Sequence, residues 1–179
     1  MRADARRNRG RILSAARAQI AATGADVSME QIAKAAGVAV GTLYRHYPTK
    51  TDLVQAVLIE YAETLVVWSE AAARAIAVPG DAAARIVELL TDFVATAATN
   101  HAIKAAARLL DTVHATPEQE ARGRVALQSL VNAARADGDI RPGITADDIY
   151  LIMLSAPAAF EKPARDRWLA LILAGVRRY

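Results

Sequence analysis

The chain has 179 residues, no cysteine and a net charge of +3, so it can form one or two small domains with a real core. The missing cysteines exclude disulfides and thiolate metal sites. We expect no secretory signal, because Arg and Asp interrupt the first eleven residues, and no stretch reaches the ~20 apolar residues that a membrane span needs. We therefore expect a cytoplasmic protein.

The net charge is unevenly distributed along the chain. Residues 1–50 hold nine Lys or Arg and three Asp or Glu, whereas residues 51–179 hold thirteen and sixteen. A basic N-terminal part on a mildly acidic remainder is typical of a DNA-binding head. A basic face for anionic lipid is the alternative, but it requires large apolar residues beside the basic ones, and residues 2–10 contain none.

The first expected helix follows a basic segment. The arginines of this segment are Arg2, Arg6, Arg7, Arg9 and Arg11. They predict an arm that is unstructured in the free protein and that either contacts DNA or serves only solubility. The apolar residues of the helix then recur with helical spacing, and they are Ile12, Leu13, Ala16 and Ile20.

Residues 28–50 predict two short helices joined by a tight turn. Ser28 and Gln31 have the spacing of a capping box at the start of the first helix. Gly37 is the expected left-handed residue that ends this helix. The second helix covers about 40–47 and ends there, because the following proline disfavours helical backbone in the residue before it.

The second of these helices has two different sides. At about 100° per residue, Leu43 and Tyr47 face the core. The side chains on the opposite side are short, polar or planar, and no Asp or Glu occurs in 39–51. Such a side suits the DNA major groove, while the alternative is a solvated hairpin that contacts nothing. We therefore predict a DNA-binding site composed of Ser28, Val40, Gly41, Thr42, Tyr44, Arg45, His46, Tyr47 and Lys50.

The order and spacing of these residues resemble a known family, the TetR (tetracycline-repressor-type) regulators. The resemblance covers about residues 9–58, and it rests on Ile32-Ala33, Ala36-Gly37-Val38, Gly41-Thr42-Leu43-Tyr44, His46-Tyr47 and Lys50. The family often has a serine where this chain has Ala39, and a lysine or polar residue where it has Val40. Ala39 removes a cap or phosphate contact, and Val40 is limited to apolar contact, such as with a thymine methyl group.

A longer helix of about six turns is expected next. Thr49 and Asp52 mark its start, where Lys50 is a candidate phosphate contact. Its apolar residues are Val54, Val57, Leu58, Tyr61, Leu65 and Trp68. Because this helix would link the head to the rest of the chain, we expect a DNA-binding domain over 1–50 and an effector-binding and dimerisation domain over 51–179.

Two middle helices follow the turn at 78–80. The first is expected to be interrupted near 100–101 and to resume at Ile103. Thr116 predicts a capped start of the second. The apolar stripe expected on this second helix consists of Val125, Leu127, Leu130, Val131 and Ala134.

The last two expected helices begin at Thr145 and Pro163. Both are apolar on nearly every side, which indicates a central position or a surface shared with a partner. In TetR-like proteins the last two helices usually pair into a four-helix bundle, so the resemblance implies a homodimer. We predict an all-α protein of about nine helices, with a three-helix DNA-binding head that contains a helix-turn-helix and a helical bundle for ligand binding and dimerisation.

The sequence contains no constellation of catalytic residues. It has no glycine-rich phosphate loop, no convincing pair of nucleophile and base, and no metal-ligand motif, so we expect no enzyme, no cofactor and no metal. The resemblance implies a small-molecule effector bound among the middle helices. The candidate pocket residues are each more simply explained as core or surface groups, and they are Tyr61, Trp68, Phe93, His101, Arg108, Asp111 and His114.

We therefore predict a sequence-specific, dimeric transcriptional regulator that binds a palindromic operator in double-stranded DNA, a repressor that a small-molecule effector releases. The alternative is a non-catalytic helical interaction protein whose basic head binds acidic partners. A linear fall of affinity for duplex DNA with the logarithm of salt concentration, together with a preference for one palindrome, separates the two.

Overall fold

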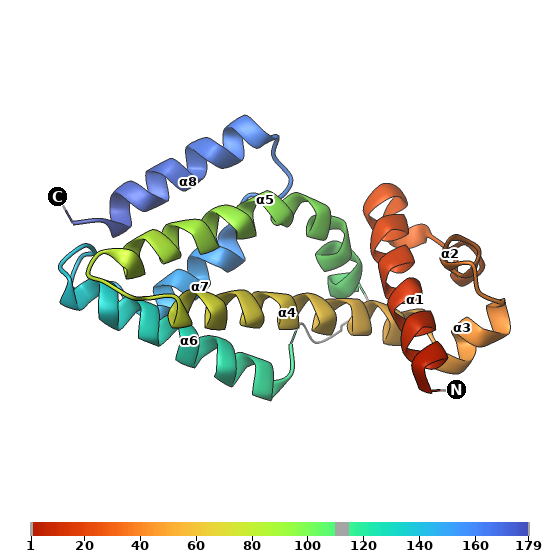
Figure 1. The fold of residues 1–179 in the computed structure, drawn as a ribbon. Helices are drawn as coiled ribbons and strands as arrows, with labels where there is room; N and C mark the ends of the chain where they lie inside the picture. Colours follow the sequence, from red (N-terminus) through yellow and green to blue (C-terminus); the bar gives the residue numbers. More distant parts are fainter. Residues whose placement is uncertain (1, 110–114, 179) are drawn as a thin grey trace. The chain divides into compact units, whose positions relative to one another are not determined.

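The computed structural model describes the backbone of residues 2–109 and 115–178, and over these residues the chain is helical, in agreement with the predicted fold (Figure 1). The first four elements are α1 (Arg2–Thr23), the short 3-10 helix η1 (Gly24–Asp26), α2 (Met29–Ala36) and α3 (Val40–His46). The others are α4 (Lys50–Arg74), α5 (Asp81–Leu109), α6 (Pro117–Ala136), α7 (Ala146–Ser155) and α8 (Lys162–Val176). No helix of this described part has the length and apolar character to cross a membrane.

These helices belong to two compact units. The first unit comprises Met1–Tyr61 and Thr99–Ala115, and the second comprises Ala62–Ala98 and Thr116–Tyr179. The helices α4 and α5 each contribute residues to both units. The predicted functional boundary after residue 50 stays a prediction, because a division by compactness does not test where DNA binding ends.

Four predicted helix starts, at Ser28, Thr49, Thr116 and Thr145, are confirmed by the geometry of their caps. Ser28 Oγ accepts the backbone N–H of Gln31 at 3.1 Å, and Gln31 Oε1 accepts the backbone N–H of Ser28 at 2.8 Å. Thr116 and Thr145 cap α6 and α7 through the same reciprocal arrangement. Each cap satisfies N–H groups that a helix end leaves unpaired, which stabilises the helix by about 1 kcal/mol.

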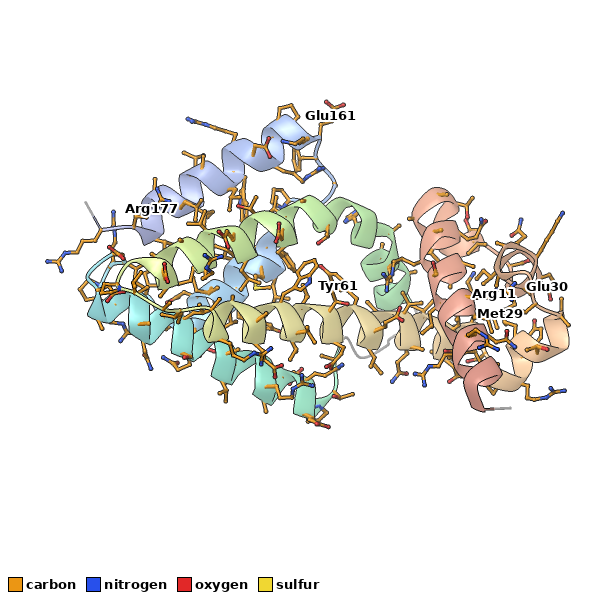
Figure 2. The ribbon with its side chains drawn as sticks, in the orientation of Figure 1. Arg11, Met29, Glu30, Tyr61, Glu161 and Arg177 are labelled. Carbon is orange, nitrogen blue, oxygen red and sulfur yellow. The ribbon has the colours of Figure 1, made fainter. Side chains whose placement is uncertain are left out.

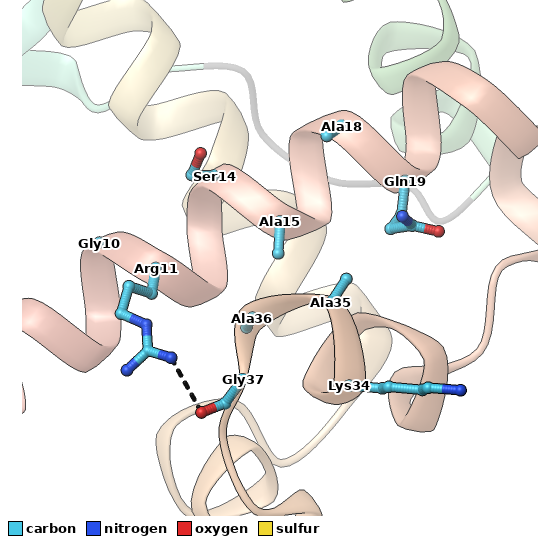
Figure 3. A pocket seen from close by; sticks show the side chains of 10 residues that line it. All are labelled: Gly10, Arg11, Ser14, Ala15, Ala18, Gln19, Lys34, Ala35, Ala36 and Gly37. Carbon is cyan, nitrogen blue, oxygen red and sulfur yellow. Dashed lines mark hydrogen bonds between the residues drawn. The ribbon is translucent and has the colours of Figure 1, made fainter.

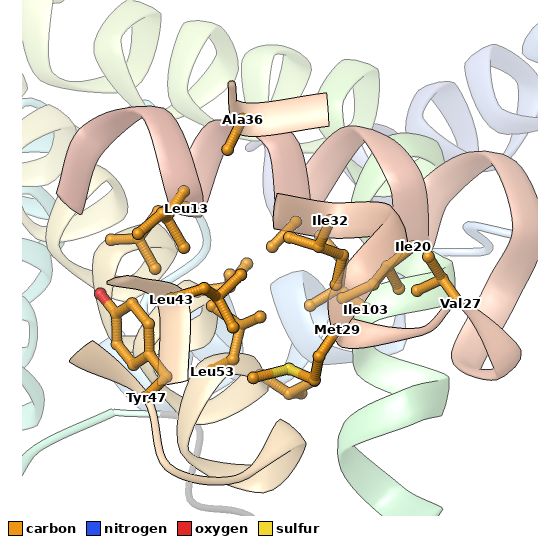
Figure 4. Packing of buried hydrophobic residues seen from close by; sticks show 14 of the residues in the cluster. Leu13, Ile20, Val27, Met29, Ile32, Ala36, Leu43, Tyr47, Leu53 and Ile103 are labelled. Atoms are coloured by element: carbon orange, nitrogen blue, oxygen red, sulfur yellow. The ribbon is translucent and has the colours of Figure 1, made fainter. Parts of the chain in front are cut away.

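The first unit has one apolar core to which each of its α-helices contributes (Figure 4). Ile20 of α1, Ile32 of α2 and Leu43 of α3 are fully buried there. Leu53 of α4 and Ile103 of α5 complete the same cluster. Burial of one such side chain contributes about 1.5–3 kcal/mol, so the core fixes the side of α3 that faces inward.

Two of the sequence predictions about α1 and α5 are wrong in detail. Residues 2–11 are the first part of α1 instead of an unstructured arm, because arginine and alanine are good helix formers. The helix α5 continues without a break through 100–101. The described buried side chains of α5 belong to the second unit up to Val94 and to the first unit from Ile103, so the apolar pattern changes along a continuous helix.

A third correction concerns the buried side of α6. Val125, which was expected in the apolar stripe, is 71% exposed, while Ala126 is buried. Residues two positions apart lie on nearly opposite sides of a helix, so Val125 cannot share the side of Leu127. The other expected residues of the stripe are buried as predicted.

An ionic cluster joins α6 to α4 within the second unit. Arg122 Nε and Nη2 donate to the two carboxylate oxygens of Glu70 at 2.9 and 3.1 Å, and Arg122 Nη1 donates to Glu63 at 2.9 Å. These hydrogen bonds, first of all those to Glu70, raise the pKa of Arg122. The pKa of Glu70 is in turn lowered, mainly by Arg122.

Candidate nucleic-acid interface

The helix α3 has one buried and one exposed side, as its sequence predicts. Leu43 is fully buried and Tyr47, the residue that ends the helix, is 7% exposed. The other side consists of the exposed Val40, Gly41, Tyr44, Arg45 and His46 and the half-buried Thr42. The apolar core thus holds α3 while its polar side chains face solvent.

The turn before α3 is held by a contact from α1. Gly37 ends α2 with φ +62°, a left-handed conformation that glycine adopts at little cost. Arg11 Nη2 donates to the Gly37 carbonyl oxygen at 2.9 Å (Figure 3). A Cβ at Gly37 would lie 2.5 Å from this Nη2 atom, so both the backbone conformation and the arginine favour glycine. Arg11, predicted as part of a basic arm, supports the turn between the two helices.

The start of α3 lacks a side-chain cap. Ala39 occupies the N-cap position, and only its carbonyl oxygen takes part, accepting the backbone N–H of Thr42 at 2.8 Å. The missing cap that we expected from alanine at this position is thereby confirmed, whereas the loss of a phosphate contact stays a prediction. Backbone hydrogen bonds to Ala39 and the burial of Leu43 hold this helix in place.

Gly41 lies on the exposed side of α3. A Cβ built there would meet no atom within 4 Å. Glycine inside a helix costs about 0.5–1 kcal/mol relative to alanine. No contact within the described structure requires glycine at this position. Close approach of another molecule to the helix would require it.

A carboxylate lies beside the exposed side of α3, although residues 39–51 contain none. The hydroxyl of Tyr44 donates to Glu30 Oε1, in the first turn of α2, at 3.2 Å. Both side chains are exposed, and Figure 2 labels Glu30. Hydrogen bonds from its own backbone N–H and from the side chains of Ser28 and Tyr44 lower the pKa of Glu30. Desolvation, and then the hydrogen bond to Glu30 and its charge, raise the pKa of Tyr44. Glu30 lies fourteen positions before Tyr44, too far along the chain for the pattern of residues 39–51 to indicate it.

The remaining predicted contacts lie near the ends of α2, α3 and α4. Ser28 caps α2 with its hydroxyl oxygen, and Lys50 is the half-buried first residue of α4. The hydroxyl oxygen of Tyr47 is buried, so a direct contact with DNA would require its exposure. Burial raises the pKa of this tyrosine, while the neighbouring Arg9 lowers it. All nine predicted residues belong to the first unit.

The described members of the predicted effector set are divided between the two units. Phe93 is buried and Trp68 half-buried in the second unit, whereas Tyr61 is buried and His101 exposed in the first. Of the remaining candidates, the side chain of Arg108 and the whole of Asp111 and His114 lie outside the described residues. The effector site therefore stays a prediction.

Open grooves occur on the surface of each unit. One, of about 630 Å³, lies between α1 and α2 and is lined by small residues together with Arg11, Gln19 and Lys34 (Figure 3). Another, of about 500 Å³, lies between α4 and α6 and includes Arg74 and Arg122. Neither groove is lined by a residue of the predicted effector set.

Known proteins resemble the chain over both of its parts. The family described as bacterial regulatory proteins, tetR family, matches residues 12–57, and the SbtR-like transcriptional regulator C-terminal domain matches residues 79–178. None of the curated proteins matches the chain.

Solved structures also share the fold over nearly the whole chain. A TetR transcription regulatory protein from Mycobacterium vanbaalenii is 31% identical over 99% of each chain, with a TM-score of 0.76. A TetR transcriptional regulator from Streptomyces coelicolor is 27% identical over 94% of this chain and 98% of its own, with a TM-score of 0.70. A gamma-butyrolactone receptor, 20% identical over 97% of this chain and 90% of its own with a TM-score of 0.66, shares the fold. The chain therefore belongs to the TetR family of bacterial transcriptional regulators.

Proposed function

We propose that this regulator is a homodimeric repressor that binds a palindromic operator through α3 and leaves it when a small-molecule effector binds. The observation that carries the proposal is the exposed side of α3, which the buried Leu43 fixes and on which Gly41 leaves open space. Such a regulator acts in the cytoplasm, where its operator lies.

The exposed side of α3 suits the major groove. Thr42, Arg45 and His46 can donate to phosphates or touch base edges, and Val40 can pack on a thymine methyl group. Lys50, at the N-terminal end of α4, can contact a phosphate, where the helix dipole also favours negative charge. The basic charge of residues 1–50 supports the same orientation toward DNA.

Apolar side chains on α7, α8 and the connection between them support a dimer. Each exposes between 45% and 61% of its surface, and they are Tyr150, Leu151, Leu154, Phe160 and Leu171. Large exposed apolar patches on a chain usually mark an interaction site. A two-fold dimer would present two copies of α3 to half-sites about 34–36 Å apart, or further apart by whole DNA turns.

The helix α4 is the element that we propose to carry effector coupling. It runs without interruption from the proposed phosphate contact at Lys50 to beyond Trp68. Trp68 and the buried Phe93, both in the second unit, are the aromatic groups beside which an effector would bind. A coupling of roughly 1–3 kcal/mol would lower DNA affinity 5–150-fold, and DNA would weaken effector binding by the same factor.

Selection of bound fragments from genomic DNA with the purified protein tests the proposal. Enrichment of one palindrome, with an affinity that falls linearly with the logarithm of salt concentration, is the expected result. If no motif is enriched and an acidic polymer such as heparin competes fully at low salt, the chain is instead an interaction protein with a basic head.

A further inference from the structure

The hydrogen bond between Tyr44 and Glu30 uses the only hydrogen that the Tyr44 hydroxyl can donate. The donor is on the exposed side of α3, and the acceptor, Glu30 Oε1, lies 3.2 Å away in the first turn of α2. An ionised carboxylate has acceptors and no donor. A ligand that approaches this pair therefore meets oxygen lone pairs only.

This arrangement disfavours the most common partner of a DNA-binding tyrosine. A phosphate offers only acceptors, so tyrosine must donate its hydrogen to bind it. Here the hydrogen is already engaged, and the negative charge of Glu30 would repel a phosphate placed next to it. Glu30, like any exposed glutamate, carries this charge at neutral pH, and its own backbone N–H together with the Ser28 and Tyr44 hydroxyl groups lowers the pKa of its carboxylate further.

The pair is suited to a base edge that donates. In the major groove, the exocyclic amines of adenine and cytosine are the hydrogen-bond donors, whereas guanine and thymine present acceptors at the corresponding positions. Both groups of the pair lie on exposed surface beside α3, the helix that we propose to enter this groove.

We infer that Glu30 and Tyr44 act together as an acceptor pair that selects adenine or cytosine at one position of each operator half-site. Tyr44 makes the contact, and Glu30 is a positioning residue that fixes the direction of the tyrosine hydrogen. The inference rests on the proposed function, since it requires α3 in the major groove.

Operator selection with matched variants tests the inference. The variants are Tyr44→Phe, Glu30→Ala, the double variant, and Asp26→Asn as a control that removes an exposed negative charge from the same unit. Wild-type protein and the control should select adenine or cytosine at one half-site position. Both single variants should lose this preference at the same position, and the double variant should lose no more, because the two residues act as one unit.

Operators that lack the amine give an independent readout. Purine in place of adenine, or 2-pyrimidinone in place of cytosine, should weaken wild-type binding roughly tenfold and leave Tyr44→Phe binding unchanged. Because Tyr44 and Glu30 are exposed, all variants should stay folded at the assay temperature, although Glu30→Ala should melt up to a few degrees lower, since it loses a favourable charge in the first turn of α2.

Two results would overturn the inference while leaving the proposed function intact. One is an unchanged base preference in Glu30→Ala with a uniform gain in affinity on all sequences, equal to that of Asp26→Asn, because Glu30 would then act through charge alone. The other is a guanine or thymine at the position that responds to Tyr44→Phe. If wild-type protein selects no motif, the proposed function itself fails.

Discussion

Replacement of Gly41 by alanine separates the stability of the DNA-binding head from its fit to DNA. The position is helical and exposed, and a Cβ built there meets no atom within 4 Å. Alanine should therefore stabilise the protein by about 0.5 kcal/mol, the lower part of the usual range, because Gly41 lies in the first turn. For a chain of this size, that gain raises the melting temperature by about 1–2 °C.

The same methyl group should weaken binding to the operator. If DNA fills the open space at Gly41, an added methyl group forces a displacement, and overpacking of this kind costs roughly 1–3 kcal/mol, or about 5–150-fold in affinity. Thermal melting and fluorescence anisotropy with a labelled operator measure the two effects on the same sample. The expected result is a higher melting temperature with lower affinity.

Gly123 of α6 provides the matched control. A Cβ at this position would lie at an ordinary contact distance of 3.6 Å from Val66 Cγ2. Gly123→Ala should therefore also stabilise the protein but leave operator affinity unchanged. If Gly41→Ala binds the operator as tightly as wild-type protein does, close approach of DNA is not the reason for glycine at this position.

The other predictions concern the phosphate contact, the dimer and the ionic cluster. Lys50→Ala should weaken binding to all DNA sequences alike and lower the slope of log affinity against log salt concentration by ~0.9. An unchanged slope would show that Lys50 does not contact a phosphate. Leu154→Glu should give a folded monomer by light scattering, because Leu154 is exposed in the protomer, and a dimer of normal affinity would contradict the proposed interface. Arg122 lowers the pKa of Glu70 below its ordinary value of 4.5, so the stability that this pair contributes is present above that pH and is lost as pH falls through the lowered pKa. Arg122→Met should therefore be less stable than wild-type protein at pH 7 in urea titrations, with a difference that shrinks below about pH 4.5, and a difference independent of pH would argue against the ion pair.

Local features of the fold could be predicted from the sequence because their causes lie within a few residues. The caps at Ser28, Thr116 and Thr145 each depend on a partner three positions away. The left-handed conformation of Gly37 follows from the lack of a side chain. The division of α3 into two sides follows from helical periodicity alone.

Features that depend on packing between distant segments could not be predicted in this way. Arg11 contacts Gly37 across 26 positions, and Tyr44 contacts Glu30 across 14. The absence of acidic residues in 39–51 therefore did not exclude a carboxylate beside α3. Similarly, the apolar pattern of α5 changes along the helix, and this change led us to predict an interruption that the helix does not have. Periodicity cannot distinguish the end of a helix from a change of packing partner.

The affinity of the wild-type protein for its selected palindrome, compared with a scrambled duplex of the same composition at physiological salt, tests the central claim most directly. A regulator that reads bases through α3 should prefer the palindrome by at least about 10³-fold and bind it as two chains per duplex. Equal affinities for the two duplexes would show that the basic head binds DNA by charge alone and would contradict sequence-specific regulation.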